Sequence, residues 1–174
     1  MKPFEDEDIT MNLLTTLLIN LFLGSSLFAG AITYKTVTVD NLEIFYREAG
    51  DPAKHKTILL LHGFPTSSQM YDELMRDLSD RYHLVAPDYP GFGKSSQPSP
   101  EESDYSFKKL TDVMEQFVNK IGVKQYALYL MDYGAPIGLR LALRNPSAIT
   151  SLIVQNGNAY EEGLREFWDP VRKY

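Results

Sequence analysis

After the first 31 residues of the chain, apolar and polar residues alternate with a period of two. Residues 36–39 and 42–46 show this alternation on either side of Asp40-Asn41, which predicts two antiparallel strands joined by a tight turn. The segment 57–61 is continuously apolar after its first residue and is followed by a Gly- and Pro-containing loop. Such a run is typical of a strand that is buried on both faces of a sheet.

Further along the chain, apolar residues recur at intervals of three and four, which favours helices between the remaining strands. A Gly-, Pro- and Ser-rich stretch over 88–103 is expected to form a loop. The predicted helices cover residues 71–78, 107–121 and 134–144, and the predicted strands cover 83–86, 126–130 and 150–155. This alternation predicts an α/β fold with a mostly parallel sheet and helices on both faces.

The first 31 residues have a different character from the rest. No charged residue occurs from Ile9 to Tyr34, an apolar run covers 13–23, and the small trio Ala29-Gly30-Ala31 follows. This pattern favours a signal peptide cleaved after Ala31; the alternatives are a membrane anchor through residues 11–31 and a buried helix. The acidic residues 5–8 do not suit a signal peptide, and we hypothesise that translation starts at Met11.

The leader interpretation predicts export to the periplasm or beyond the cell, or attachment to a membrane. If residues 1–31 are not a leader, the expected location is cytoplasmic.

Composition narrows the classes of function. A chain of 174 residues with 44% hydrophobic and 23% charged residues suits one globular domain. The absence of cysteine excludes a disulfide scaffold, a thiolate nucleophile and a cysteine metal site. The net charge is −6 and no basic stripe is present, so nucleic acid is not an expected partner.

The most informative junction is Asp132-Tyr133-Gly134, where a predicted strand turns directly into a predicted helix. A sharp turn of this kind raises one side chain above the carboxyl edge of the sheet, where ligands bind in parallel sheets. The raised group would be the carboxylate of Asp132, and Gly134 would let the helix pass close by. The alternative is that Asp132 only caps the helix.

Three segments together resemble the α/β-hydrolase superfamily, in particular its epoxide hydrolase and haloalkane dehalogenase branch. They are His62-Gly63-Phe64-Pro65, the loop 88–95 with Asp88, Gly91 and Gly93, and Asp132-Tyr133-Gly134. The resemblance covers about residues 35–160. It implies an α/β-hydrolase fold whose N-terminal core spans 32–160, with residues 161–174 beginning the lid of that family.

The resemblance also implies a mechanism for a small-molecule substrate. Asp132 would attack an epoxide or halogen-bearing carbon and form an alkyl-enzyme ester, which water would then hydrolyse. Backbone N–H groups of Phe64 and Tyr133 would form the oxyanion hole. Haloalkane dehalogenases often place a halide-binding Asn where this chain has Phe64, so the resemblance favours an epoxide. No cofactor and no metal ion is expected.

Other polar residues of these motifs are expected to have structural roles. His62 is expected to shape the loop after its strand, and Asp88 is expected to accept local backbone hydrogen bonds. The segment Gly93-Lys94-Ser95 is not expected to bind phosphate, because Asp88 stands where that motif needs glycine.

The triad of this family runs nucleophile, acid, histidine along the chain, but no histidine follows His83 and amides end the last predicted strand. The fold is therefore expected to be truncated before the lid and the last strands. Three hypotheses follow: a truncated hydrolase, a hydrolase completed by another chain, and a non-catalytic binding module. The strand at 150–155 is expected to leave an open sheet edge that promotes self-association.

Overall fold

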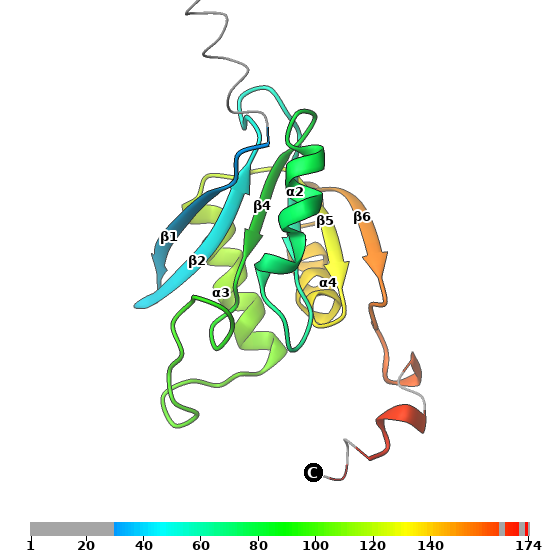
Figure 1. The fold of residues 1–174 in the computed structure, drawn as a ribbon. Coiled ribbons are helices and arrows are strands. Elements are labelled where there is room, and N and C mark those ends of the chain that lie inside the picture. Colours follow the sequence, from blue (N-terminus) through cyan, green and yellow to red (C-terminus); the bar gives the residue numbers. More distant parts are fainter. Residues whose placement is uncertain (1–29, 164–165, 171–172, 174) are drawn as a thin grey trace, which may run out of the picture.

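The computed structural model describes residues 30–163, 166–170 and 173 (Figure 1). A six-stranded sheet in the order β1-β2-β4-β3-β5-β6 forms the centre of the molecule. The strands are β1 (Thr33–Val39), β2 (Leu42–Ala49), β3 (Thr57–Leu61), β4 (His83–Pro87), β5 (Tyr126–Met131) and β6 (Ile149–Gln155). Strands β4, β3, β5 and β6 are parallel, so their carboxyl ends meet at one edge of the sheet.

Helices cover both faces of this sheet, as the alternation predicts (Figure 1). The helix α2 (Asp72–Leu78) packs on one face through Met75, while α3 (Phe107–Lys120) and α4 (Gly134–Arg144) pack on the other. Alternate residues of the central strands feed the two cores: Leu59 and Leu61 enter the α3/α4 core, and Ile58 and Leu60 enter the α2 core.

The predicted β-hairpin is confirmed and extends further than the alternation indicates. Asp40 and Asn41 both adopt positive φ angles, 47° and 64°, which is the conformation that the tightest hairpin turns require. Pairing continues to Thr33 opposite Glu48, so the hairpin is longer than the predicted segments. The second strand then pairs antiparallel with β4 and joins the hairpin to the parallel strands.

The predicted helix at 71–78 differs from the structure at its start. A 3₁₀ helix, η1 (Ser68–Tyr71), precedes α2, and the hydroxyl of Ser67 accepts a hydrogen bond from the Gln69 N–H at 3.4 Å. Short 3₁₀ helices also occur at η2 (Pro146–Ala148), η3 (Glu161–Gly163) and η4 (Glu166–Trp168). The other predicted helices and strands lie within a few residues of their observed bounds.

Nearly all of the leader predicted over residues 1–31 lies outside the described residues, which begin at Gly30. In the part of the chain that the structure describes, no helix is both long and apolar enough to cross a membrane.

A partly buried polar cluster joins the hairpin to the amino ends of the parallel strands. The Nε2 of His83 lies 2.8 Å from Oε1 of Glu48, and Thr57 Oγ1 lies 2.9 Å from the Nδ1 of the same histidine. The Lys35 ammonium forms an ion pair with Glu48. The hydrogen bond from His83, assisted by Lys35, outweighs burial and lowers the pKa of Glu48 from 4.5 to about 2.

We expect Glu48→Gln to make the unfolding free energy less dependent on pH between about 2 and 4.5. Because the pKa of Glu48 is depressed in the folded chain, its contribution is complete above about pH 4.5 and disappears as the pH falls toward 2. The variant should lose about 2 kcal/mol of unfolding free energy at pH 7 and much less at pH 2. Urea unfolding at a series of pH values measures this; a constant difference between the two chains across that range would refute it.

Candidate active site

The end of β5 forms a sharp turn that carries Asp132. This residue adopts a φ of +48°, a left-handed conformation that aspartate tolerates better than most residues, and α4 begins two positions later at Gly134. A Cβ on Gly134 would lie 2.2 Å from the carbonyl oxygen of Leu61. Only glycine therefore fits at this position, and its absent side chain lets the start of α4 lie against the end of β3.

The carboxylate of Asp132 accepts hydrogen bonds from two backbone N–H groups. Its Oδ1 lies 2.9 Å from the nitrogen of Phe64 and 2.7 Å from the nitrogen of Tyr133. Gly63 allows this approach, because a Cβ there would lie 2.6 Å from the Asp132 Cβ. Among the described residues no hydrogen bond reaches Oδ2.

The geometry does not support the alternative of a simple helix cap. The N-cap position of α4 is Tyr133, and no side chain caps the helix there. The Asp132 side chain instead reaches across to the loop after β3, which brings Phe64, Tyr133 and Asp132 together as the sequence motifs imply.

His62 lies inside the loop after β3 and does not face Asp132's free oxygen. Its Nδ1 lies 3.0 Å from the carbonyl oxygen of Gly63, and its Nε2 accepts the N–H of Tyr89 at 3.4 Å. The Nδ1 therefore carries the proton, and complete burial lowers the pKa of this histidine. Both ring nitrogens are used to hold the loop, and the ring stacks on Tyr89 with centroids 4.2 Å apart.

Asp88 ties the two glycine-containing loops together. Its Oδ1 accepts the Ser68 N–H at 2.7 Å, and its Oδ2 accepts the Lys94 N–H at 2.9 Å. A Cβ on Gly93 would lie 2.0 Å from Oδ2, so the carboxylate fills the space that a side chain would need. Asp88 is 1% exposed and lies away from the cleft beside Asp132, which agrees with a structural role.

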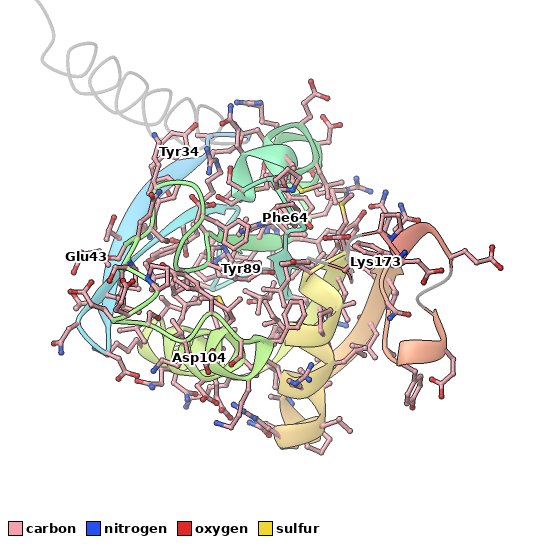
Figure 2. The ribbon with its side chains drawn as sticks, turned by 90° about the horizontal axis from the view of Figure 1, so that it is seen from below. Tyr34, Glu43, Phe64, Tyr89, Asp104 and Lys173 are labelled. Atoms are coloured by element: carbon pink, nitrogen blue, oxygen red, sulfur yellow. The ribbon has the colours of Figure 1, made fainter. Side chains whose placement is uncertain are left out.

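The remaining motif residues lie in these same loops. Pro65 follows Phe64 directly, and Gly91 adopts a φ of +84° against the ring of Tyr105. Figure 2 shows this edge of the molecule from the carboxyl ends of the parallel strands, with Phe64 and Tyr89 near its middle.

Aromatic rings surround the candidate nucleophile. The ring of Tyr133 lies 5.4 Å from that of Phe64, 4.9 Å from Phe107 and 6.4 Å from Phe92, measured between centroids. The sequence patterns did not indicate Phe107 or Phe92 as site residues. Phe107 fitted the apolar face of a helix, and its position in the first turn of α3, beside the site, depends on tertiary packing.

A cleft of about 570 Å³ opens beside Asp132. Asp132 is the only carboxylate and Arg140 the only cation among the described residues that line it. Its walls are Phe107, Asp132, Tyr133, Pro136, Arg140, residues 156–160, Gly163 and Trp168. The segment after β6 thus supplies one wall, and its residues Gly163 and Trp168 lie in the stretch 161–174 where the resemblance implies the start of a lid.

No histidine lines this cleft. His83 lies at the amino end of β4 beside Glu48, and His55 precedes the amino end of β3. All three histidines of the chain are among the described residues, and none of them lines the cleft or forms a hydrogen bond with Asp132. Within the described residues no group of three or more acidic or histidine side chains could hold a metal ion.

Comparison with known proteins agrees with this geometry. The sequence profile of the α/β hydrolase fold family matches residues 56–174. An uncharacterised hydrolase of Saccharomyces cerevisiae is 46% identical over 142 residues, which are 81% of this chain and 48% of the yeast protein. A haloalkane dehalogenase of Mycolicibacterium paratuberculosis is 37% identical over 117 residues, which are 67% of this chain and 38% of that protein.

Solved structures show the same arrangement. A bacterial membrane phospholipase A superposes with a TM-score of 0.74 and 28% identity, covering 97% of this chain and 58% of its own. The haloalkane dehalogenase DatA of Agrobacterium tumefaciens superposes with a TM-score of 0.71 and 27% identity, covering 82% and 48%. The chain spans about half the length of the curated relatives it matches. The profile match and the shared fold show that this chain belongs to the α/β-hydrolase fold family.

Proposed function

We propose that Asp132 is the nucleophile of a hydrolase that forms an alkyl-enzyme ester with a small organic substrate. The observation that carries the proposal is the asymmetric environment of the carboxylate. Two N–H groups hold Oδ1, while Oδ2 receives no hydrogen bond from the described residues. Oδ2 is therefore the oxygen whose lone pair can attack a bound electrophile.

The first step is a displacement at carbon. Oδ2 forms a bond to the substrate carbon while the bond from that carbon to its leaving group breaks. With an epoxide, the C–O bond to the attacked carbon breaks. The ring oxygen stays bonded to the neighbouring carbon and takes a proton from water, which becomes hydroxide. With a haloalkane the halide ion leaves. Either reaction converts Asp132 into an ester whose carbonyl oxygen is Oδ1.

The same N–H groups suit the second step. When water attacks the ester carbonyl, negative charge develops on Oδ1, which already lies 2.9 Å and 2.7 Å from the Phe64 and Tyr133 nitrogens. Donors that are in place before the charge develops stabilise it without reorganisation. The backbone amides would thus act as the oxyanion hole of ester hydrolysis.

Hydrolysis also needs a base that activates water, and the described site offers none. His62 uses one ring nitrogen within its own loop and the other on Tyr89 in the loop after β4, while His55 and His83 lie near the amino ends of β3 and β4. We therefore expect this chain to form the ester much faster than it hydrolyses it.

The surroundings of Asp132 favour an apolar substrate. Phe64, Phe107 and Tyr133 present aromatic surface next to the carboxylate, and Phe64 is 59% exposed. The relatives named haloalkane dehalogenases favour a halogen-bearing carbon. Phe64 at the position where that group often carries a halide-binding Asn favours an epoxide.

Intact-mass spectrometry tests the proposal and separates the two substrate classes. The chain is incubated in parallel with an aryl epoxide and with a 1-bromoalkane of similar size. The proposal expects one stoichiometric adduct, equal to the whole epoxide or to the alkyl group replacing a proton, with little steady turnover. A chain that binds either compound without an adduct would instead be a non-catalytic binding module.

A further inference from the structure

The peptide group that joins Gly63 to Phe64 is held at both of its ends. At one end its N–H, which belongs to Phe64, donates to Oδ1 of Asp132 at 2.9 Å. At the other end its carbonyl oxygen, which belongs to Gly63, accepts three hydrogen bonds. The donors are the Nδ1–H of His62 at 3.0 Å and the N–H and hydroxyl of Thr66 at 3.1 Å and 2.8 Å. One peptide group therefore links the candidate nucleophile to a cluster of donors behind it.

The other N–H group at Oδ1 has a simpler arrangement. It belongs to the peptide that joins Asp132 to Tyr133, and the carbonyl oxygen of that peptide accepts the Ala135 N–H at 2.9 Å. A carbonyl oxygen has two lone pairs, so the three donors at Gly63 use all of its capacity. The Gly63–Phe64 peptide is thus the more firmly held of the two.

Donors on a carbonyl oxygen change the N–H of the same peptide. Each hydrogen bond draws electron density toward the oxygen and makes that N–H a stronger donor, with a cooperative gain of roughly 10–30% per bond. The three contacts at Gly63 also fix the plane of the peptide, so the Phe64 N–H points at Oδ1 before charge develops there. Groups that never touch Asp132 can therefore act on its carboxylate through this peptide.

We propose that Thr66 is a positioning residue of the oxyanion hole, whose hydroxyl strengthens and orients the Phe64 N–H through the Gly63 carbonyl. The inference rests on the proposed function, in which negative charge develops on Oδ1 during hydrolysis of the ester. The hydroxyl also lies 3.3 Å from Sδ of Met70. Because a thioether is a weak acceptor, the carbonyl oxygen at 2.8 Å is the main acceptor of this hydroxyl.

Thr66 can be tested apart from the fold. His62 is completely buried and stacks on Tyr89, so its replacement would disturb the packing of the loop. Thr66 is exposed, and Thr66→Val removes the hydroxyl while the backbone N–H of this residue remains. Thr66→Ser restores the donor. The matched control is Thr33→Val on β1, because the Thr33 hydroxyl also donates to a backbone carbonyl oxygen, that of Glu48 at 3.0 Å.

Release of the ester measures the contribution of Thr66 to the reaction. The adduct on Asp132 is formed first, and imidazole is then added as an external base. Imidazole takes a proton from the water that attacks Cγ, and the electron pair of the carbonyl bond moves to Oδ1. Collapse of this intermediate breaks the bond between Cγ and Oδ2, and the imidazolium protonates the departing alkoxide.

Thr66→Val should slow this release about tenfold, which is less than the loss of a direct oxyanion donor. Formation of the adduct should change less than about twofold, because that step develops no new charge on Oδ1. Thr66→Ser and Thr33→Val should release the ester at the rate of the unmodified chain. Equal release from Thr66→Val and the unmodified chain would overturn the proposal. So would equal slowing of formation and release, which would show that the variant only disturbs the loop.

The amide proton resonance of Phe64 gives a readout that needs no reaction. A weaker hydrogen bond moves an amide proton upfield, so Thr66→Val should move this resonance upfield while Thr66→Ser and Thr33→Val leave it in place. An unchanged Phe64 resonance in Thr66→Val would overturn the proposal. Absence of any adduct in the unmodified chain would instead contradict the proposed function of Asp132, and the Phe64 resonance would still decide whether Thr66 acts on this N–H.

Discussion

Asp132→Asn should abolish formation of the covalent adduct and leave the fold intact. An amide nitrogen at the position of Oδ2 is a poor nucleophile, so we expect the rate of adduct formation to fall by at least about 1,000-fold. The amide oxygen can still accept the N–H groups of Phe64 and Tyr133. Asparagine also tolerates positive φ, as Asn156 does at 50° in the lining of the same cleft.

The control for this experiment is Glu162→Gln, which removes an exposed acid from the short helix η3 near the cleft. This variant should react at the rate of the unmodified chain. Thermal melts of both variants should lie within about 2 °C of the unmodified chain if the fold is unchanged. Retention of the adduct in Asp132→Asn would remove Asp132 from the mechanism.

Gly134→Ala should cause a large loss of stability, because the start of α4 packs directly on the end of β3 at this residue. The new methyl group would lie 2.2 Å from the Leu61 carbonyl oxygen and 2.9 Å from the Leu61 Cβ. Because the first contact is with backbone in the centre of the sheet, α4 or β3 must move. We expect a loss of about 3 kcal/mol or more in unfolding free energy, or failure to fold.

Gly122→Ala is the matched control for this prediction. Gly122 has a φ of +76°, but a Cβ there meets no atom within 4 Å. The expected loss is therefore only the cost of a left-handed alanine, about 1 kcal/mol. Chemical denaturation of both variants measures the difference, and equal losses would show that close packing of α4 on β3 is not what requires Gly134.

The fold follows from local signals that agree with one another. The continuous apolar run of β3, the apolar spacing of three and four in α3 and the turn residues Asp40-Asn41 each act within a few residues, so the sequence alone locates their elements. The 3₁₀ helix η1 was not predicted, because its conformation depends on the contact from Ser68 to Asp88, twenty residues away.

The site was predictable only in part, for a related reason. The turn at Asp132 and the nearby glycines leave a signature in the sequence, since each is a local steric requirement. The resemblance to the family implies that the Phe64 N–H serves the site, but no local pattern does, because this residue lies 68 positions from Asp132. The contact of Phe107 with Tyr133 depends on how α3 packs and was not expected. Such contacts follow from the tertiary arrangement and leave no periodic pattern in the chain.

The most direct test of the account is to locate the adduct by peptide mapping. After reaction with the epoxide or the bromoalkane, the chain is digested and each peptide is sequenced by tandem mass spectrometry. The proposed geometry, with Oδ1 held by two N–H groups and Oδ2 free, predicts that the added mass resides on Asp132 alone. Modification spread over exposed carboxylates such as Glu162 and Glu166, with Asp132 unmodified, would contradict it.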